Sequence, residues 1–377
     1  MIYLDSASTT KPSPAVVEVV TKSMEEKYFN PSSMHSKGHM VEGVLKDIKE
    51  KFADYLNVLP DEIIFTSGGT ESNNLAILGA AKAQKKKNHI ITVKTEHPSV
   101  QCSVASLKKQ GYKVDYLDTD KWGYVDKTKL KELISEETVL VSIMDVNNEI
   151  GVVQDITEIG RIIKKANPEV IFHVDGIQSF GKRRISLKHV DMFSFSSHKI
   201  HGPKGAGALY VRNGVKMHPL VFGGEQQKKL RPGTENTFGI FGFAKATEEA
   251  YTNMEQRQDH VQTLRDRLLV ITKVLPDVVV NSDIVNGSPY ILNISFLGVK
   301  GEVLLHSLSQ DGIYVATGAA CSKKTISSVL KSLGAAKEIH ESAIRFSFCY
   351  ENTAEDIDKT IEVVKKHVEF LRKYVRK

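Results

Sequence analysis

The feature that most restricts the fold is a repeated pattern of short apolar runs, each ending in polar residues. These runs cover residues 62–69, 89–99, 138–151, 170–181 and 190–199. Amphipathic stretches lie between them, and the clearest one, 70–87, predicts a helix. Strands that alternate with helices pair through right-handed crossovers into a mostly parallel sheet. The pattern therefore predicts an α/β fold.

The pattern changes after about residue 242. The predicted elements there are one long helix over 243–275, a strand over 288–296, a helix near 301–310 and a closing helix within 356–375. This order is typical of a smaller α+β domain, and 377 residues are too many for one simple core. We predict a large domain over 11–242 and a small domain made of 1–10 and 243–377.

Composition restricts the function less than the pattern does. The net charge of +6, with 41% hydrophobic and 25% charged residues, is ordinary for a globular chain, so we expect no direct nucleic acid partner. Cys102, Cys321 and Cys349 lack the spacing of a disulfide framework or a zinc site, which favours a reducing, cytoplasmic setting and no metal. The first ten residues have no signal-peptide pattern, and no apolar run is long enough for a membrane span.

The polar residues that follow the apolar runs indicate where a ligand binds. In an open α/β sheet, ligands bind beyond the carboxyl ends of the strands. The candidates there are Gly69 and Thr70, Glu96 and His97, Asn148, Asp175 and Gln178, and Ser196, His198 and Lys199. Taken singly, Asp175 could be a helix cap, His97 a turn residue and Lys199 a surface residue.

Taken together, these residues suit pyridoxal phosphate. This cofactor needs a lysine for a Schiff base, an acid at the pyridine nitrogen, a flat group over the ring and donors for the phosphate. We assign Lys199 to the Schiff base, Asp175 to the ring nitrogen and His97 to the ring face. We expect Gln178 to donate to the phenolic oxygen, and we expect Gly69, Thr70, Ser196 and His198 to bind the phosphate.

Ten motifs carry a resemblance to a known family. In order they are YLDSASTT, NPSSMHSKG, EIIFTSGGTESNN, TEHPSV, LVSIMDVNNEIGVVQDI, FHVDGIQSFGK, SFSSHKIHGPKGAGALYV, RPGTEN, GAACS and IRFSF. Over almost its full length the chain resembles the NifS/IscS-like cysteine desulfurases, pyridoxal-phosphate enzymes of the class V aminotransferase group. The resemblance implies fold type I, with a mostly parallel seven-stranded sheet in the large domain and a smaller α+β domain.

The resemblance also implies a reaction and further roles. L-cysteine would lose its sulfur to Cys321, giving L-alanine and a persulfide that passes to an acceptor protein, in iron–sulfur cluster assembly or in thiolation of tRNA or cofactors. Asn148 and Arg345 would hold the substrate carboxylate. Thr234 would bind the phosphate of the partner subunit in a homodimer. Cys321 lies in ATGAACSKKTISS, whose small, polar and basic residues predict an exposed loop.

The sequence departs from the family pattern at three places, and it leaves alternatives open. DSASTT, RPGT and GGEQQ replace the more usual DNAATT, RSGT and GGGQE. The alternatives are a selenocysteine lyase, an aminotransferase or a serine-type lyase of the same fold. A catalytically inactive sulfur-transfer scaffold is another, although the complete set of Lys199, Asp175 and Cys321 argues against it.

Overall fold

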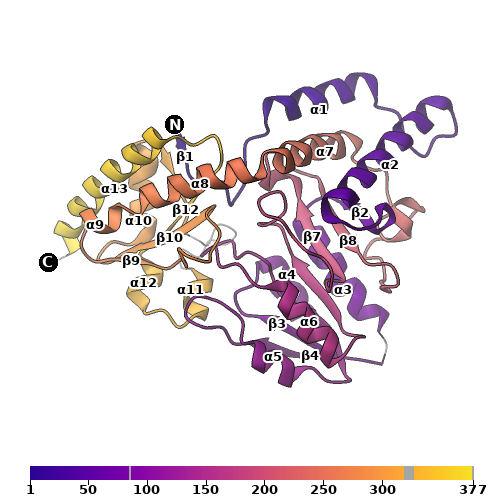
Figure 1. Ribbon diagram of the computed structural model, residues 1–377, viewed down its shortest axis with the longest axis horizontal. Helices are drawn as coiled ribbons and strands as arrows, with labels where there is room; N and C mark the ends of the chain where they lie inside the picture. Colours follow the sequence, from indigo (N-terminus) through magenta and orange to yellow (C-terminus); the bar gives the residue numbers. More distant parts are fainter. Residues whose placement is uncertain (85, 318–326, 376–377) are drawn as a thin grey trace.

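A seven-stranded sheet forms the centre of the larger part of the molecule, as the computed structural model shows for residues 1–84, 86–317 and 327–375 (Figure 1). The strand order is β2-β8-β7-β6-β5-β3-β4. The strands are β2 (Ile63–Thr66), β3 (His89–Val93), β4 (Lys113–Leu117), β5 (Thr138–Ser142), β6 (Ile171–Asp175), β7 (Met192–Ser196) and β8 (Gly207–Val211). Only β8 runs antiparallel to its neighbours in this sheet. The predicted mostly parallel α/β sheet of seven strands is confirmed.

Helices cover both faces of this sheet. One face packs against α1 (Pro14–Glu26), α2 (Ser36–Leu56), α5 (Lys127–Leu133), α6 (Ile156–Ala166) and α7 (Thr237–Thr252), and the other face against α3 (Gly69–Ala83) and α4 (Pro98–Lys109). A cluster of aromatic rings centred on Phe52, Phe180, Phe195 and Phe243 fills the first interface. Parallel strands buried on both faces explain why the strand sequences are continuously apolar.

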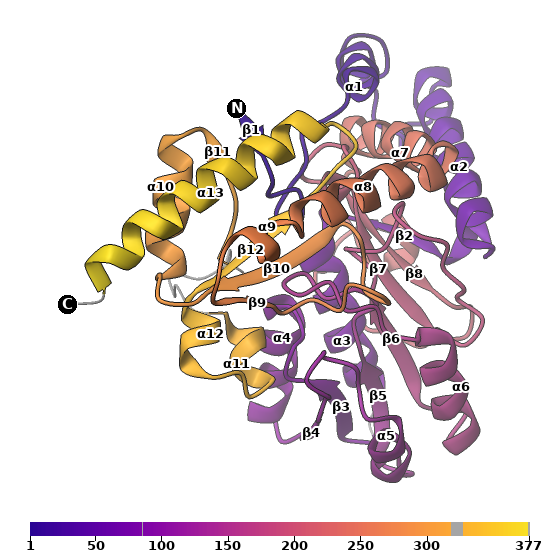
Figure 2. The same cartoon turned by 60° about the vertical axis from the view of Figure 1, so that its left-hand side comes forward.

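The smaller part contains a three-stranded antiparallel sheet of order β12-β10-β9. Its strands are β9 (Val278–Val280), β10 (Ile291–Phe296) and β12 (Ala343–Ser347). The helices packed around it are α8 (Met254–Leu268), α9 (Ile271–Val274), α10 (Gly301–Gln310), α11 (Ser328–Ser332), α12 (Lys337–Glu341) and α13 (Ala354–Val375). Strand β1 (Ile2–Tyr3) pairs with β11 (Ile313–Tyr314), so the chain begins and ends on this part (Figure 2).

Two predicted helices have different limits in the structure. Helix α3 ends at Ala83, before the lysine-rich stretch that was predicted to continue it. The predicted helix over 243–275 is divided into three helices. Asn253 leaves the helical conformation between α7 and α8, with φ −112° and ψ 17°, and a second break separates α8 from α9 after Leu268. Helix α7 also begins earlier than predicted, since the Asn236 side chain accepts a hydrogen bond from the Gly239 amide and caps the helix there.

The packing of α7 bears on the predicted domain boundary. Phe241, Phe243, Ala250 and Tyr251 all belong to the apolar cluster on the large sheet. The division at residue 242 stays a prediction, and we propose moving it to Asn253, where the helix is interrupted.

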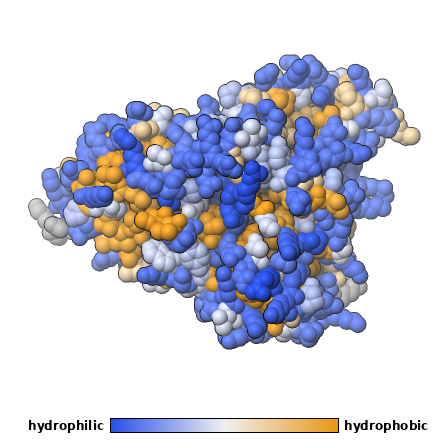
Figure 3. All heavy atoms as spheres, viewed as in Figure 1, coloured by the Kyte–Doolittle hydropathy of each residue, from blue (hydrophilic) through white to orange (hydrophobic). Residues whose placement is uncertain are grey.

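The surface is mostly hydrophilic on the face shown in Figure 3, with apolar residues gathered near α9 and β9. Val270 and Val274 of this region are 41% and 40% exposed.

Among the residues that the structure describes, no helix is long and apolar enough to cross a membrane. Within the same residues, no three His, Cys, Asp or Glu side chains form a metal-binding group.

Truncation of Phe243 tests whether α7 is part of the large-domain core. Its ring is fully buried, with its centroid 4.9 Å from that of Phe52. Phe243→Ala should reduce the free energy of unfolding by about 3–5 kcal/mol, because it removes a buried ring and leaves a cavity. Chemical denaturation measures this change. Phe370→Ala, at a ring that is 51% exposed, is the control and should change the value by less than about 1 kcal/mol. An equally small change at Phe243 would contradict the assignment of α7 to this core.

Candidate active site

A cavity of about 310 Å³ lies where the carboxyl ends of the parallel strands meet the N-terminal segment and β12. It is lined by Ala7, Ser8, Gly69, Thr70, His97, Met144, Val146, Asn148, Asp175, Ile177, Gln178, His198, Lys199 and Arg345. Nine residues predicted from the sequence are therefore gathered in one place. Ser196 and Thr234 do not line the cavity, and Cys321 lies outside the described residues.

Lys199 reaches the cavity from η2 (Ser197–Lys199), the single 3₁₀ turn that follows β7. Its Nζ donates hydrogen bonds to the carbonyl oxygens of Ala7, at 2.7 Å, and Ser8, at 2.6 Å. The N-terminal segment thus holds the amine in place with two backbone acceptors.

Asp175 is the last residue of β6. Burial raises the pKa of its carboxyl, and the strongest effect that opposes this rise comes from His97. Asn73 Nδ2 donates to Asp175 Oδ2 at 2.7 Å, and the Ile177 amide donates to Oδ1 at 3.1 Å. The nearby carboxyl of Glu96 is also buried, and burial together with Asp175 raises its pKa well above the usual value. The Glu96 carboxyl accepts a hydrogen bond from the Met144 amide. The Asp175 carboxyl accepts from the two donors just named, and the basic groups of His97 and Lys199 lie near it. We infer that Asp175 carries the negative charge and that Glu96 stays protonated.

His97 caps helix α4, and its ring is held by Ser99. Its Nδ1 accepts from the Ser99 amide at 3.1 Å and contacts Ser99 Oγ at 2.8 Å. Burial lowers the pKa of His97, and the opposing effect of Asp175 is smaller. The ring is therefore neutral near pH 7, and the amide contact at Nδ1 places its proton on Nε2. A neutral planar ring suits the predicted position over an aromatic cofactor.

The first turn of α3 and the end of β7 form a site suited to phosphate. No side chain caps α3, and its first two residues, Gly69 and Thr70, line the cavity, so the helix N-terminus lies at this site. A Cβ on Gly69 would lie 2.1 Å from the Ile177 side chain, so any larger residue there would have to displace Ile177. Ser196 Oγ is buried, and within the described part of the chain it has no hydrogen-bond partner. A buried hydroxyl without a partner next to open helix amides fits a bound phosphate, so the residues present suit pyridoxal phosphate.

Arg345 of β12 approaches from the small domain and is 1% exposed. Its guanidinium donates to Asp5 Oδ1 at 2.6 Å, to Ser8 Oγ at 2.7 Å and to the backbone carbonyl of Asn148 at 2.8 Å. Its Nε is buried and makes no hydrogen bond in the described part of the chain. A guanidinium held on three sides with a donor left over suits a carboxylate ligand.

Thr234 does not line the cavity, and it is exposed. The unusual GGEQQ segment braces the loop that carries Thr234. Gln226 Oε1 accepts from the Gly233 amide at 3.1 Å, and Gln227 Oε1 accepts from the Phe65 amide at 3.0 Å. Arg231 Nε donates to Glu71 Oε1 at 2.9 Å, which ties the loop to the first turn of α3.

The described residues on either side of the Cys321 segment are both anchored beside the cavity. Ala316 pairs with Arg345 through two backbone hydrogen bonds, of 3.2 and 2.7 Å. On the other side, Ser327 Oγ donates to Glu149 Oε2 at 2.5 Å. Burial raises the pKa of Glu149 to about 7.

Three contributors to the site were not predicted. Asn73, one helical turn after Gly69, links Asp175 to Ser99; its place in the GGTESNN motif was the only signal for it. Asp5 pairs with Arg345, and the carbonyls of Ala7 and Ser8 hold Lys199. These contacts join residues far apart in the chain, and no local pattern reports them.

Residues 2–360 match the profile of the family described as Aminotransferase class-V. The chain belongs to this family. The chain is 41% identical over 373 residues to a cysteine desulfurase IscS of Clostridium botulinum, covering 97% of this chain and 94% of that protein. It is 42% identical over 377 residues to a cysteine desulfurase of Nostoc, covering 99% and 94%. A solved structure of a NifS-like protein matches with a TM-score of 0.93 at 38% identity, covering 98% of this chain and 99% of that one.

The family match confirms the predicted resemblance and, with it, the predicted cofactor class. Class-V enzymes of this kind use pyridoxal phosphate, and the cavity of this class-V enzyme holds a lysine, an acid and an imidazole in the arrangement such a cofactor needs.

His198, which lines the cavity, and His201, two residues after Lys199, give a prediction for how stability depends on pH. Burial lowers the pKa of His198 and of His201 to about 4, whereas an unfolded histidine titrates near pH 6.5. Between these values only the unfolded state binds the extra protons, so stability should fall as the pH drops from 6.5 towards 4. His201→Gln should reduce that slope by about 1.4 kcal/mol per pH unit, measured by denaturation at several pH values. His39→Gln, at an exposed position, is the control, and equal slopes for wild type and His201→Gln would refute this interpretation.

Proposed function

We propose that this class-V enzyme removes sulfur from L-cysteine with pyridoxal phosphate bound in the cavity. The products are L-alanine and a persulfide on Cys321. The Cβ–Sγ bond of the substrate breaks, its electron pair stays on the carbon skeleton, and that carbon takes up a proton. The sulfur forms a bond to the Cys321 sulfur, which is oxidised as the substrate carbon is reduced, so no other oxidant is needed.

The observation that carries this proposal is the convergence of Lys199, Asp175 and His97 on one cavity that Arg345 closes from the small domain. When bound, the cofactor supplies an electron-withdrawing ring joined to the substrate nitrogen. The ionised Asp175 keeps the ring nitrogen protonated. His97 would cover the ring face as a neutral imidazole, and the Lys199 amine would hold the cofactor and carry a proton at Nζ when it is released.

The part of the cavity wall that carries Arg345 and Asn148 positions the substrate. The Arg345 guanidinium binds a carboxylate, with Asn148 beside it at the cavity wall. Both anchors of the Cys321 segment, Ala316 and Ser327, lie next to residues of this wall, which supports a role for Cys321 as the sulfur acceptor. The curated relatives named above are cysteine desulfurases.

We further propose a homodimer in which Thr234 binds the phosphate in the partner's site. The support is that Thr234 is exposed on a braced loop and does not reach its own cavity. A cytoplasmic setting and a protein acceptor for the persulfide, in iron–sulfur assembly or thiolation, complete the proposal. Cys102 and Cys349 are both free thiols, which agrees with a reducing compartment.

The competing activities differ in their products and substrates. A desulfurase forms alanine and sulfide in equal amounts from cysteine under a reductant, while an aminotransferase needs a keto acid acceptor. A selenocysteine lyase would turn over selenocysteine in strong preference to cysteine. A purified chain without Schiff-base absorbance would point instead to a sulfur-transfer scaffold.

Substitution of the acceptor thiol tests the sulfur step. Cys321→Ser should keep the cofactor absorbance and lose at least about 100-fold in sulfide release, because the hydroxyl is a far weaker nucleophile than a thiolate. Sulfide and alanine are measured together with cysteine as substrate. Cys102→Ser, at an exposed position on α4, is the matched control and should keep wild-type turnover. Wild-type sulfide release from Cys321→Ser would move the acceptor role elsewhere.

Arg345→Lys tests the carboxylate contact. A lysine cannot reproduce the bidentate fork of a guanidinium, so the KM for cysteine should rise about 10-fold or more while the cofactor spectrum stays unchanged. Steady-state kinetics and an absorbance spectrum of the same preparation measure the two effects. An unchanged KM would remove Arg345 from substrate binding.

A further inference from the structure

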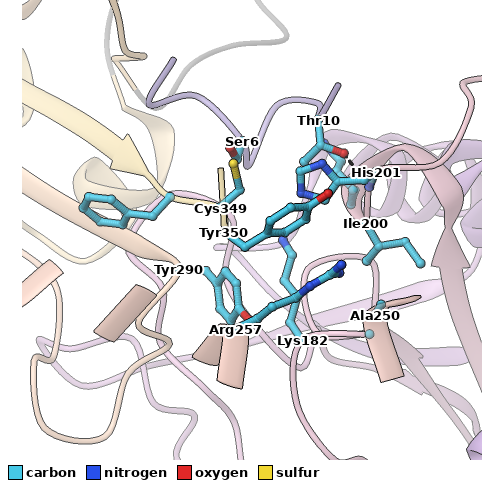
Figure 4. Close-up of a pocket in the computed structure, with 13 residues that line it drawn as sticks. Ser6, Thr10, Lys182, Ile200, His201, Ala250, Arg257, Tyr290, Cys349 and Tyr350 are labelled. Atoms are coloured by element: carbon cyan, nitrogen blue, oxygen red, sulfur yellow. Dashed lines mark hydrogen bonds between the residues drawn. The ribbon is translucent and has the colours of Figure 1, made fainter. Parts of the chain in front are cut away.

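A second lysine, Lys182, lies buried behind Lys199. A small cavity of about 20 Å³ is lined by both lysines together with Ser6, Arg257, Tyr290, Cys349 and Tyr350 (Figure 4). Figure 4 shows the Lys182 side chain running up among the rings of Tyr290 and Tyr350. Its Nζ lies 5.4 Å from the centre of the Tyr290 ring, and the residue is 9% exposed.

This lysine has no acidic partner. Of the carboxylates in the described residues, none lies within ion-pair distance of Lys182, whereas its neighbour Arg183 pairs with Asp145 at 2.8 Å. Burial of an ammonium without a carboxylate is costly, and a methionine or leucine would fill the same space at a lower cost. A buried lysine retained beside an active site therefore points to a role in that site.

The contacts of Lys182 lead to Lys199 through two groups. Lys182 Nζ donates to Gln178 Oε1 at 3.3 Å, and Gln178 Nε2 donates to the carbonyl of Ala7 at 2.9 Å. The same carbonyl accepts from Lys199 Nζ at 2.7 Å. The two contacts of Gln178 fix which end of its amide is nitrogen, because a flipped amide would set two oxygens against each other and an NH₂ group against Lys182.

We propose that Lys182 is a positioning residue for the cofactor site: it orients the amide of Gln178 and, as a buried cation, opposes a second positive charge at Lys199. This inference rests on the proposed function. The oriented amide keeps one N–H for the phenolic oxygen of the cofactor. A positive Lys182 favours the unprotonated form of the Schiff base that Lys199 makes.

The ionisable groups that face Lys182 come from several elements. They are Lys199 of η2, His201 next to it, Arg257 of α8, Arg345 of β12, and Tyr290, Cys349 and Tyr350. The pKa of Lys182 is lowered to about 7. Burial is the largest cause, and the positive charge of Lys199 is the next largest. Lys182 thus gains or loses its charge near neutral pH, and that charge is coupled to the charge on Lys199.

The test is an absorbance titration of the Schiff base in the purified holoenzyme, in three variants. Lys182→Met removes charge and donor, Lys182→Gln removes the charge alone, and Lys182→Arg keeps both. The Schiff-base pKa should rise by about 1 pH unit in Lys182→Met, somewhat less in Lys182→Gln, and stay near wild type in Lys182→Arg. The cofactor should also dissociate several-fold more readily from Lys182→Met than from Lys182→Gln.

Lys164→Met is the matched control, because Lys164 is a partly buried lysine of α6 that binds Asp191 and a carbonyl away from the cavity. It should not move the Schiff-base pKa. An unchanged pKa in Lys182→Gln and Lys182→Met, or an equal rise in Lys182→Arg, would overturn the inference. If Lys182→Met does not fold, the difference in Schiff-base pKa between Lys182→Gln and Lys182→Arg still tests the inference. Wild-type enzyme without Schiff-base absorbance would instead refute the proposed function.

Discussion

The parallel pairing of β5, β6 and β7 is the constraint on which the rest of the structure depends. Each of these strands is buried on both faces, and each ends at the same edge of the sheet, where polar residues take over from apolar ones. His173 reinforces the pairing, with Nδ1 2.9 Å from Ser142 Oγ and Nε2 3.0 Å from Ser194 Oγ. Burial lowers the pKa of His173 to about 3, so the ring stays neutral within the sheet. The edge that carries Asp175 is thereby held by side chains as well as by the backbone.

The N-terminal segment completes the site by joining the two domains. Asp5 binds Arg345 of the small domain, while Ala7 and Ser8 accept from Lys199 of the large domain. The Ala7 amide also donates to Ser347 Oγ at 2.9 Å on β12. One segment therefore contacts both the guanidinium that we propose binds the substrate carboxylate and the amine that we propose binds the cofactor.

The sequence predicted most of the fold and most of the cavity for a physical reason. Runs of apolar residues broken by polar ones at their carboxyl ends specify parallel strands, and such strands bring Thr70, His97, Asp175 and Lys199 together without knowledge of any contact. The limits of α7 were harder to predict. A single asparagine at each end, Asn236 and Asn253, sets them, although the apolar pattern continues past Asn253. The partners of the reactive groups could not be predicted at all. Asn73 and Asp5 act across long sequence separations, and only the folded chain places them beside Asp175 and Arg345. Lys182 is only four residues from Gln178, but no local pattern reports that its side chain is buried against the amide.

We propose that Lys199, and not the buried Lys182 beside it, forms the covalent bond to the cofactor. Reduction of the holoenzyme with borohydride converts that bond to a stable secondary amine, and peptide mass spectrometry then locates it. We expect the modification only on the peptide that contains Lys199. A modification on Lys182, or on neither lysine in a protein that contains pyridoxal phosphate, would contradict it.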